Sequence, residues 1–272
     1  MMNVHILGSG AAQPAKGRHC SAQVVAVDGR RFLVDCGEGT QTQLRIAHLK
    51  LQALSHIFLS HLHGDHLFGL PGLLSTMHMC GRKDPVDIYA PAGLQAPLTQ
   101  LFEVSGSHID FEVRYHELTA ASPQVVFEDA KLRITAFPMP HSVPTYGFLF
   151  QELSPRHPNS YAYCCDTGYT EDFLPVIRDV DLLCMESTFM SDFEAVAAER
   201  FHLTARQAAT LALKADAKML LLTHFSARYS DVQPLLDEAR AVFPNTLAAI
   251  EGKTLQVRHQ VAVEPEQDSG IQ

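Results

Sequence analysis

No stretch of this 272-residue sequence reaches the roughly 18 to 20 apolar residues that a membrane-spanning helix needs. The first ten residues, MMNVHILGSG, lack the basic and long apolar segments of a secretion signal. The six cysteines are scattered and include no CxxC pair. We therefore expect a soluble cytoplasmic protein that has no membrane partner and whose thiols are reduced and mostly buried.

Positive charge is also scarce. The chain has 21 lysines and arginines against 30 aspartates and glutamates, a net charge of −9. This balance argues mildly against a surface that coats nucleic acid, although a local basic patch stays open. Histidine is abundant by contrast, with 15 residues. That number justifies a systematic search for metal ligands.

Short apolar runs typical of β-strands alternate with helical stretches along the chain. Helices are predicted at 40–49, 93–104, 204–216 and 231–243, and Thr204 stands at the N-cap position of the third helix. Because helices and strands are interspersed, we expect an α/β fold with helices covering sheets. One domain is predicted at 1–263 and a disordered tail at 264–272. The predicted strands are 4–7, 31–36, 56–60, 86–90, 132–137, 146–150, 161–165, 182–186, 219–223 and 246–250.

The stretch FLSHLHGDHLFGLPGLL concentrates polar ligand types between apolar flanks. His61 and His63 are two residues apart, so on an extended strand end they point the same way. Asp65 and His66 lie on the turn that follows. The segment can therefore supply ligands to two adjacent metal ions. A polar surface turn, the alternative, would need neither the glycine between the ligands nor the apolar flanks.

Three further candidate ligands each follow an apolar strand: His141, Asp166 and His224. Each alone would more often be an ordinary loop residue, but together they complete two ligand sets. Imidazole and carboxylate ligands suit zinc, with manganese or iron as alternatives. The predicted sets are His61, His63 and His141 for one ion, Asp65, His66 and His224 for the second, and Asp166 as the bridge.

With these residues the sequence resembles the metallo-β-lactamase superfamily, which implies a four-layered αβ/βα sandwich with metals at one edge. A narrower resemblance is to ribonuclease Z, the endonuclease that trims the 3′ ends of tRNA precursors. PAKGRH (14–19) is similar to that family's Pro-x-Lys-x-Arg-Asn loop, with His19 in place of asparagine. The other motifs that carry this resemblance are FLVDCGEGTQTQL (32–44), SHLHGDHLFGLPGLL (60–74), SGSHIDFEVRYHEL (105–118), ITAFPMPHSVPTYGF (134–148), MESTF (185–189) and LTHFSARY (222–229).

The resemblance implies a metal-dependent phosphodiesterase in which a metal-bridging hydroxide hydrolyses RNA to a 3′-hydroxyl and a 5′-phosphate. Asp65 would orient or accept the proton of the water. His202 matches the family's proton donor and Glu186 its carboxylate partner. Without the resemblance, His202 reads as a solvent-facing residue at a helix start, and Glu186 as a capping or salt-bridge carboxylate. The family also implies a homodimer.

Some residues near the predicted site have less specific roles. Lys16, Arg18 and Arg228 are candidate phosphate holders, because arginine grips two phosphoryl oxygens at once. Arg228 could equally form a structural ion pair. Asp35 is a candidate hydrogen-bond partner of a ligand histidine.

The sequence departs from the ribonuclease Z pattern in one respect. The family carries a long flexible arm between the strand after the third metal histidine and the bridging aspartate, and grips tRNA with it. Here that interval is only LFQELSPRHPNSYAYCC. Two alternatives therefore stay open: a phosphodiesterase for a small substrate, such as a cyclic nucleotide or short oligonucleotide, and a non-catalytic, metal-stabilised binding module. The complete ligand set and proton donor disfavour the second alternative.

Overall fold

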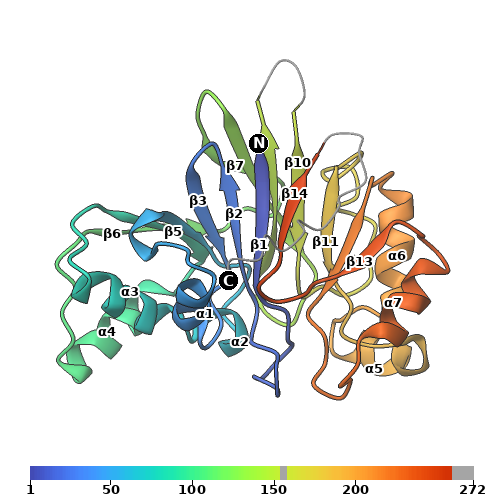
Figure 1. Ribbon diagram of the computed structural model, residues 1–272, viewed down its shortest axis with the longest axis horizontal. Helices are drawn as coiled ribbons and strands as arrows, with labels where there is room; N and C mark the ends of the chain where they lie inside the picture. The colour runs from blue at the N-terminus through green and yellow to red at the C-terminus, as the bar shows by residue number, and fades with distance from the viewer. Residues whose placement is uncertain (154–157, 259–272) are drawn as a thin grey trace, which may run out of the picture.

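The computed structural model describes residues 1–153 and 158–258. They form two seven-stranded sheets packed face to face between two groups of helices (Figure 1). The strand orders are β14-β1-β2-β3-β4-β5-β6 and β13-β12-β11-β10-β9-β8-β7. Helices α1 to α4 lie on the outer side of the first sheet, and α5 to α7 on the outer side of the second (Figure 1). This arrangement confirms the predicted four-layered sandwich.

The first sheet contains β1 (Met2–Gly8), β2 (Ala22–Val27), β3 (Arg30–Val34), β4 (Leu54–Phe58), β5 (Val86–Pro91), β6 (Val113–Leu118) and β14 (Thr254–Val257). The second contains β7 (Gln124–Glu128), β8 (Leu132–Met139), β9 (Thr145–Glu152), β10 (Ser160–Cys164), β11 (Leu182–Glu186), β12 (Leu220–Thr223) and β13 (Thr246–Ala248). The α-helices are α1 (Thr40–Ile46), α2 (Gly64–Leu67), α3 (Leu70–Met79), α4 (Gln95–Ser105), α5 (Glu194–Glu199), α6 (Ala205–Lys214) and α7 (Gln233–Arg240).

Aromatic side chains fill the space between the two sheets. The ring of Phe58 on β4 lies 5.3 Å from that of Phe148 and 5.8 Å from that of Phe150, both on β9. All three side chains are fully buried. A second apolar cluster, which includes Leu33 and Leu73, lies between the first sheet and its helices. Burial on both faces explains why many strands read as continuous apolar runs.

Each sheet joins an antiparallel half to a parallel half. Strands β3 to β6 are parallel in the first sheet, and β10 to β13 in the second. The carboxyl ends of parallel strands meet at one edge of a sheet, where their loops gather. Helices α2 and α5 lie at the same end of the sandwich, the lower end in Figure 1. The segments that follow β4, β10, β11 and β12 therefore supply side chains to this end.

The structure contains all four helices and all ten strands predicted from the sequence, with shifted ends. Thr204 caps α6 as predicted, and it forms a capping box with Gln207. Sequence reasoning missed β2, β6, β7 and β14, three of which are edge strands. It also missed α2, α3 and α5, of which α3 contains the Pro-Gly pair of LPGLL. Proline is accepted there because it lies in the first turn of α3.

Within the described residues, no helix combines the length and apolar character required to cross a membrane. All six cysteines are described and free, and only Cys80 among them is exposed. This confirms the predicted state of the thiols. The predicted tail, 264–272, lies outside the described residues.

Candidate metal centre

The segment after β4 brings most of the candidate ligands to the lower end of the sandwich. His61 and His63 lie in the connection after the strand, whereas Asp65 and His66 lie on α2. This turn packs closely against the segment that follows β3. A Cβ atom on Gly69 would stand 2.1 Å from a backbone oxygen of that segment. Glycine is therefore required there for α2 to sit against the sheet.

The ligand atoms of three histidines and one carboxylate lie close together and form the first candidate metal site. The Nδ1 atom of His63 lies 2.9 Å from Nε2 of His61 and 3.4 Å from Nε2 of His141. The Oδ2 atom of Asp166 lies 3.5 Å from the same nitrogen of His61 and 3.6 Å from that of His141. Tetrahedral ligand atoms about 2.0–2.2 Å from one ion are separated by about 3.3–3.6 Å. The group therefore has the dimensions of a metal site.

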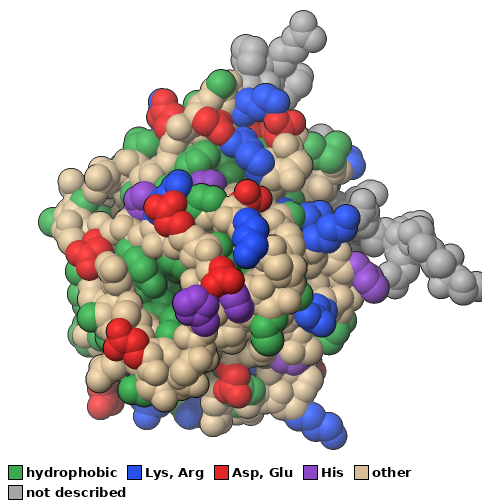
Figure 2. Space-filling model, turned by 90° about the vertical axis from the view of Figure 1, so that its left-hand side faces the viewer, with side chains coloured by type: hydrophobic (Ala, Val, Ile, Leu, Met, Phe, Trp, Pro, Cys, Tyr) green, Lys and Arg blue, Asp and Glu red, His purple; other side chains and the backbone are tan. Residues whose placement is uncertain are grey.

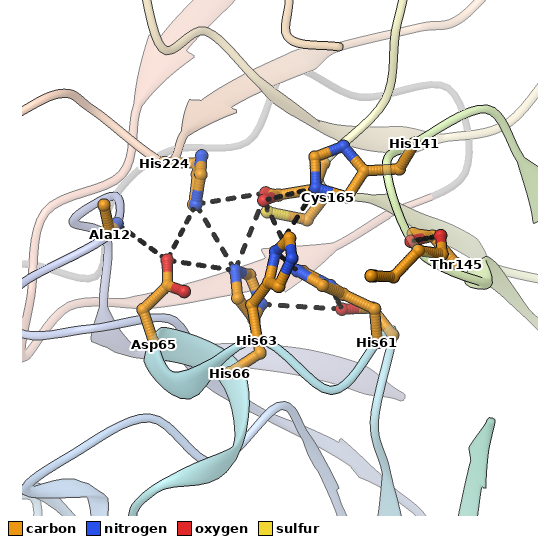
Figure 3. Close-up of polar contacts among 12 residues, drawn as sticks. Ala12, His61, His63, Asp65, His66, His141, Thr145, Cys165 and His224 are labelled. Carbon is orange, nitrogen blue, oxygen red and sulfur yellow. Dashed lines mark hydrogen bonds and ion pairs between the residues drawn. The ribbon is translucent and has the colours of Figure 1, made fainter. Parts of the chain in front are cut away.

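A second group of ligand atoms, which includes those of His66 and His224, lies next to the first (Figure 3). The Oδ1 atom of Asp166 is 3.0 Å from Nε2 of His224 and 3.6 Å from Nε2 of His66. The Oδ2 atom of Asp65 is 3.3 Å from each of these two nitrogens. Asp166 thus turns one oxygen toward each group, which is the arrangement of a bridging carboxylate.

Cys165 also lies beside the second group, which sequence reasoning did not anticipate. Its Sγ atom and ligand atoms of His66, Asp166 and His224 all lie within 4.8 Å of one another. Burial raises the pKa of the Cys165 thiol well above its ordinary value. The thiol donates to Oδ1 of Asp166 over 3.3 Å, so it lies directly beside the carboxylate between the two groups.

Four of the candidate ligand histidines have their outer ring nitrogen next to an oxygen atom. If each outer N–H donates to that oxygen, the inner nitrogens carry lone pairs and converge as acceptors. Converging acceptors need a cation between them, so the residues present fit divalent metal ions. The predicted contact of Asp35 with one of these histidines is present, at His66. The outer contacts are His61 Nδ1 to Ser60 Oγ at 3.0 Å, His66 Nδ1 to Asp35 Oδ2 at 2.7 Å, His141 Nδ1 to the Phe201 carbonyl at 3.0 Å, and His224 Nδ1 to Thr188 Oγ1 at 3.0 Å.

The protonation of His61, His141 and Asp65 suits metal binding. Burial lowers the pKa of His61 to about 2 and also lowers the pKa of His141. Burial alone would raise the pKa of Asp65, but the neighbouring His66 and His224 bring it well below its ordinary value. Neutral imidazoles and ionised carboxylates are the forms that bind divalent metals. The carboxylates of Asp35, Asp166 and Asp65 outweigh the effect of burial and raise the pKa of His66 well above its ordinary value, so His66 would release a proton when a metal binds.

A histidine and a glutamate lie beside the two metal groups. The Nδ1 atom of His202 is 3.1 Å from both carboxylate oxygens of Glu186, which is fully buried. Burial lowers the pKa of His202, but the charge of Glu186 and the hydrogen bond to it outweigh this effect and raise the pKa to about 9. The backbone N–H groups of Thr167 and Leu203 also donate to Glu186. His202 is therefore protonated at neutral pH and firmly oriented.

These groups face a common cavity of about 190 Å³. Its lining includes the candidate ligands Asp65, His141 and Asp166, together with His202. The ring of His202 lies 5.4 Å from that of His141. A substrate group in the cavity would therefore touch the metal-binding edge and the protonated histidine together.

The three candidate phosphate holders lie outside the lining of this cavity. Lys16 is exposed in the connection between β1 and β2. The guanidinium of Arg18 donates to three backbone carbonyls of the segment that follows β12. The guanidinium of Arg228 lies over the rings of Phe193 and Phe189, with its Cζ atom 4.1 Å and 5.4 Å from their centroids. Phosphate binding by these residues stays a prediction.

Sequence reasoning missed three contributors to the site. The backbone N–H of Ala12 donates to Oδ2 of Asp65 over 2.7 Å, a contact that no side-chain pattern could reveal. Arg200 lines the cavity. Thr188 contacts both Glu186 and His224 through its hydroxyl. The sequence did offer a signal for Thr188, because this residue stands in the motif MESTF.

Comparisons with known proteins agree with this geometry. The sequence model of one protein family, the β-lactamase superfamily domain, matches residues 30–225 of this chain. A ribonuclease Z from Porphyromonas gingivalis is 37% identical, covering 92% of this chain and 97% of its own. The chain belongs to the ribonuclease Z family. A ribonuclease Z from Azobacteroides pseudotrichonymphae is 40% identical, over 93% of this chain and 98% of its own.

The solved structures include the short form of human tRNase Z, which has a TM-score of 0.81 and 32% identity and covers 94% of this chain and 99% of its own. Strand β9 ends at Glu152 and β10 begins at Ser160. The long arm of the ribonuclease Z pattern would lie between these two strands. The short interval expected from the sequence is therefore 153–159, of which 154–157 lie outside the described residues.

Proposed function

We propose that this protein is a two-metal phosphodiesterase that removes 3′ trailers from tRNA precursors. The observation that carries the proposal is the cavity that joins two sets of metal-ligand atoms, with Asp166 between them, to the hydrogen-bonded pair of His202 and Glu186. The family membership of the chain points to the same reaction. Divalent ions bound there lower the pKa of water and offset charge on the phosphoryl oxygens.

The side chains of the site have separate tasks in this proposal. Asp65, held by the N–H of Ala12, binds metal and accepts or orients the proton of the attacking water. His202 donates a proton to the leaving 3′-oxygen. Glu186 keeps His202 protonated and fixes its ring, since both of its oxygens lie within 3.1 Å of Nδ1. The products would carry a 3′-hydroxyl and a 5′-phosphate.

Zinc is the metal that we propose for both sites. The ligand atoms are imidazole nitrogens and carboxylate oxygens, a combination that zinc accepts readily. Manganese or ferrous iron would accept the same ligands. Metal analysis of the purified protein, followed by removal with a chelator and restoration with single metals, would decide among them.

We further propose that the protein forms a homodimer in the cytoplasm, with 1–263 as its one catalytic domain. On the face formed by β5, β6, α3 and α4, hydrophobic side chains are exposed among interspersed charges (Figure 2). They include Met79 on α3 and Leu101 and Val104 on α4. A second copy of the chain that covered this face would remove these side chains from water. Sedimentation analysis of the wild-type chain would test the dimer.

The first experiment is cleavage of a labelled tRNA precursor with a 3′ trailer, compared with hydrolysis of bis(p-nitrophenyl) phosphate. The metal-loaded wild-type protein should release the trailer, and an Asp65→Ala variant should not. Hydrolysis of the small ester without cleavage of the precursor would instead favour the small-substrate phosphodiesterase, which the short interval 153–159 allows. If the metal-loaded wild-type protein shows neither activity, the non-catalytic binding module is favoured.

A further inference from the structure

An RNA substrate brings more phosphates to the cavity than the one that is cut. An RNA chain brings a negative charge at each phosphate, and the cavity is already lined by Asp65 and Asp166. Among the described residues that line it, Arg200 is the one with a lysine or arginine side chain. Arginine is the side chain best suited to a phosphate, because its planar group donates to two oxygens at once.

Arg200 is available for such a contact. Its side chain is exposed, and no described carboxylate forms an ion pair with it. The two arginines that the sequence suggested are engaged elsewhere: Arg18 donates to backbone carbonyls, and Arg228 lies on two aromatic rings. Substrate binding by Arg200 would therefore not require a protein contact to break.

The backbone on either side of Arg200, which lines the cavity, is held by hydrogen bonds. The N–H of Arg200 donates to the carbonyls of Val196 and Ala197 at the end of α5. Phe201 has a positive φ of 55°, and its carbonyl accepts from the ligand His141. The next residue, His202, is fixed by Glu186. Arg200 is thus anchored within two residues of the proposed proton donor.

We propose that Arg200 binds the phosphate that neighbours the scissile one on its 5′ side. This inference rests on the proposed function and deepens it. His202 would protonate the leaving 3′-oxygen, which belongs to the nucleotide on the 5′ side of the cut. The phosphate of that same nucleotide is the next charge along the chain, and Arg200 lines the same cavity as His202, two residues before it in the sequence. Arg200 would thus position the RNA without taking part in the proton transfer.

The test compares Arg200→Ala with the wild-type enzyme on a tRNA precursor and on bis(p-nitrophenyl) phosphate. We expect kcat/KM for the precursor to fall about 10- to 100-fold, the usual worth of a charged hydrogen bond. Hydrolysis of the small ester, which has no neighbouring phosphate, should change less than about twofold. The slope of log kcat/KM against log salt concentration should become shallower by about 0.7, as for one lost contact with a single strand.

A modified substrate separates this contact from a general effect of charge. A precursor with a neutral methylphosphonate at the linkage 5′ to the cut, and a 2′-deoxy sugar beside it for stability, is compared with its charged counterpart. On the neutral substrate, Arg200→Ala should cause no further loss, because the two changes remove the same interaction. Arg200→Lys should recover part of the activity on the charged substrate. Arg178→Ala, which removes an exposed arginine that pairs with Asp216, is the matched control.

The outcomes are distinguishable. An unchanged kcat/KM on the precursor, an equal loss on both substrates, or a full additional loss on the neutral linkage would each overturn the role of Arg200. Failure of the wild-type enzyme to cleave the precursor would overturn the proposed function, and this inference with it.

Discussion

The hydroxyl of Thr188 lies 3.0 Å from Nδ1 of the candidate ligand His224. The same hydroxyl donates to Oε2 of Glu186 over 2.5 Å. One buried oxygen therefore accepts the outer N–H of a ligand histidine and donates to the carboxylate that holds His202. The metal-binding edge and the proton donor are oriented by a single shared network.

Replacing Thr188 by valine should weaken metal binding while preserving the fold, because valine keeps the shape but leaves the outer N–H of His224 without its partner. Loss of such a partner costs about 10- to 100-fold in metal affinity. Titration of metal-free protein with zinc against a chromophoric chelator would measure this. Thr188→Ser, which keeps the hydroxyl, should bind zinc like the wild-type protein, and equal affinity in both variants would contradict the role of the hydroxyl.

Replacing His202 by alanine should affect two substrates differently. The ribose oxygen of RNA is a poor leaving group that needs a proton, so precursor cleavage should fall about 10²- to 10⁴-fold. The p-nitrophenolate group departs without protonation, so hydrolysis of bis(p-nitrophenyl) phosphate should change little. Steady-state kinetics on both substrates provides the measurement. A large loss on the small ester would show that His202 acts on something other than the leaving oxygen.

Replacing Glu186 by glutamine should shift the pH profile of precursor cleavage. His202 acts as an acid, so activity requires its protonated form and is lost as the pH rises through its pKa of about 9. Burial lowers this pKa and the Glu186 carboxylate raises it. Removal of the carboxylate charge should therefore move the alkaline limb to lower pH. An alkaline limb that stays in place when kcat/KM is measured across pH 6 to 10 would assign it to another group.

Replacing Asp35 by asparagine should loosen the second ligand group. Asp35 is buried and accepts from Ser60, His66 and Tyr163. The neutral amide is a weaker acceptor for the outer N–H of His66, so zinc affinity should fall about 10- to 100-fold. Equilibrium dialysis followed by metal analysis would measure the loss. A variant that keeps two tightly bound ions per chain would contradict this account.

Metal removal should also lower thermal stability, because inner nitrogens that converge as acceptors are left without a cation. Saturation at 100 times the dissociation constant stabilises a folded protein by about 2.7 kcal/mol. For a chain of this size that is a rise in Tm of about 5–10 °C. Calorimetry of stripped and reloaded protein would reveal it. In the variant His61→Ala, the rise in Tm on reloading with metal should be smaller than in the wild-type protein. An identical rise in Tm would argue against metal binding by the first ligand group.

The sequence by itself determined the ligand types and their placement at strand ends. His61, His63, Asp65 and His66 are close in sequence, so their proximity follows from local geometry. His141, Asp166 and His224 were found because each directly follows an apolar run. The interspersed strands and helices likewise predicted sheets covered by helices, because burial and capping leave strong local patterns, whereas the four layers were implied by the family resemblance.

Only the tertiary structure decided which groups share the cavity and which are engaged elsewhere. The contact of Ala12 with Asp65 uses a backbone N–H that every residue except proline possesses, so no pattern could mark it. Arg18, Arg200 and Arg228 are chemically alike in sequence. Packing assigned one to backbone carbonyls, one to aromatic rings and one to the cavity, because contacts between distant segments depend on how the two sheets meet.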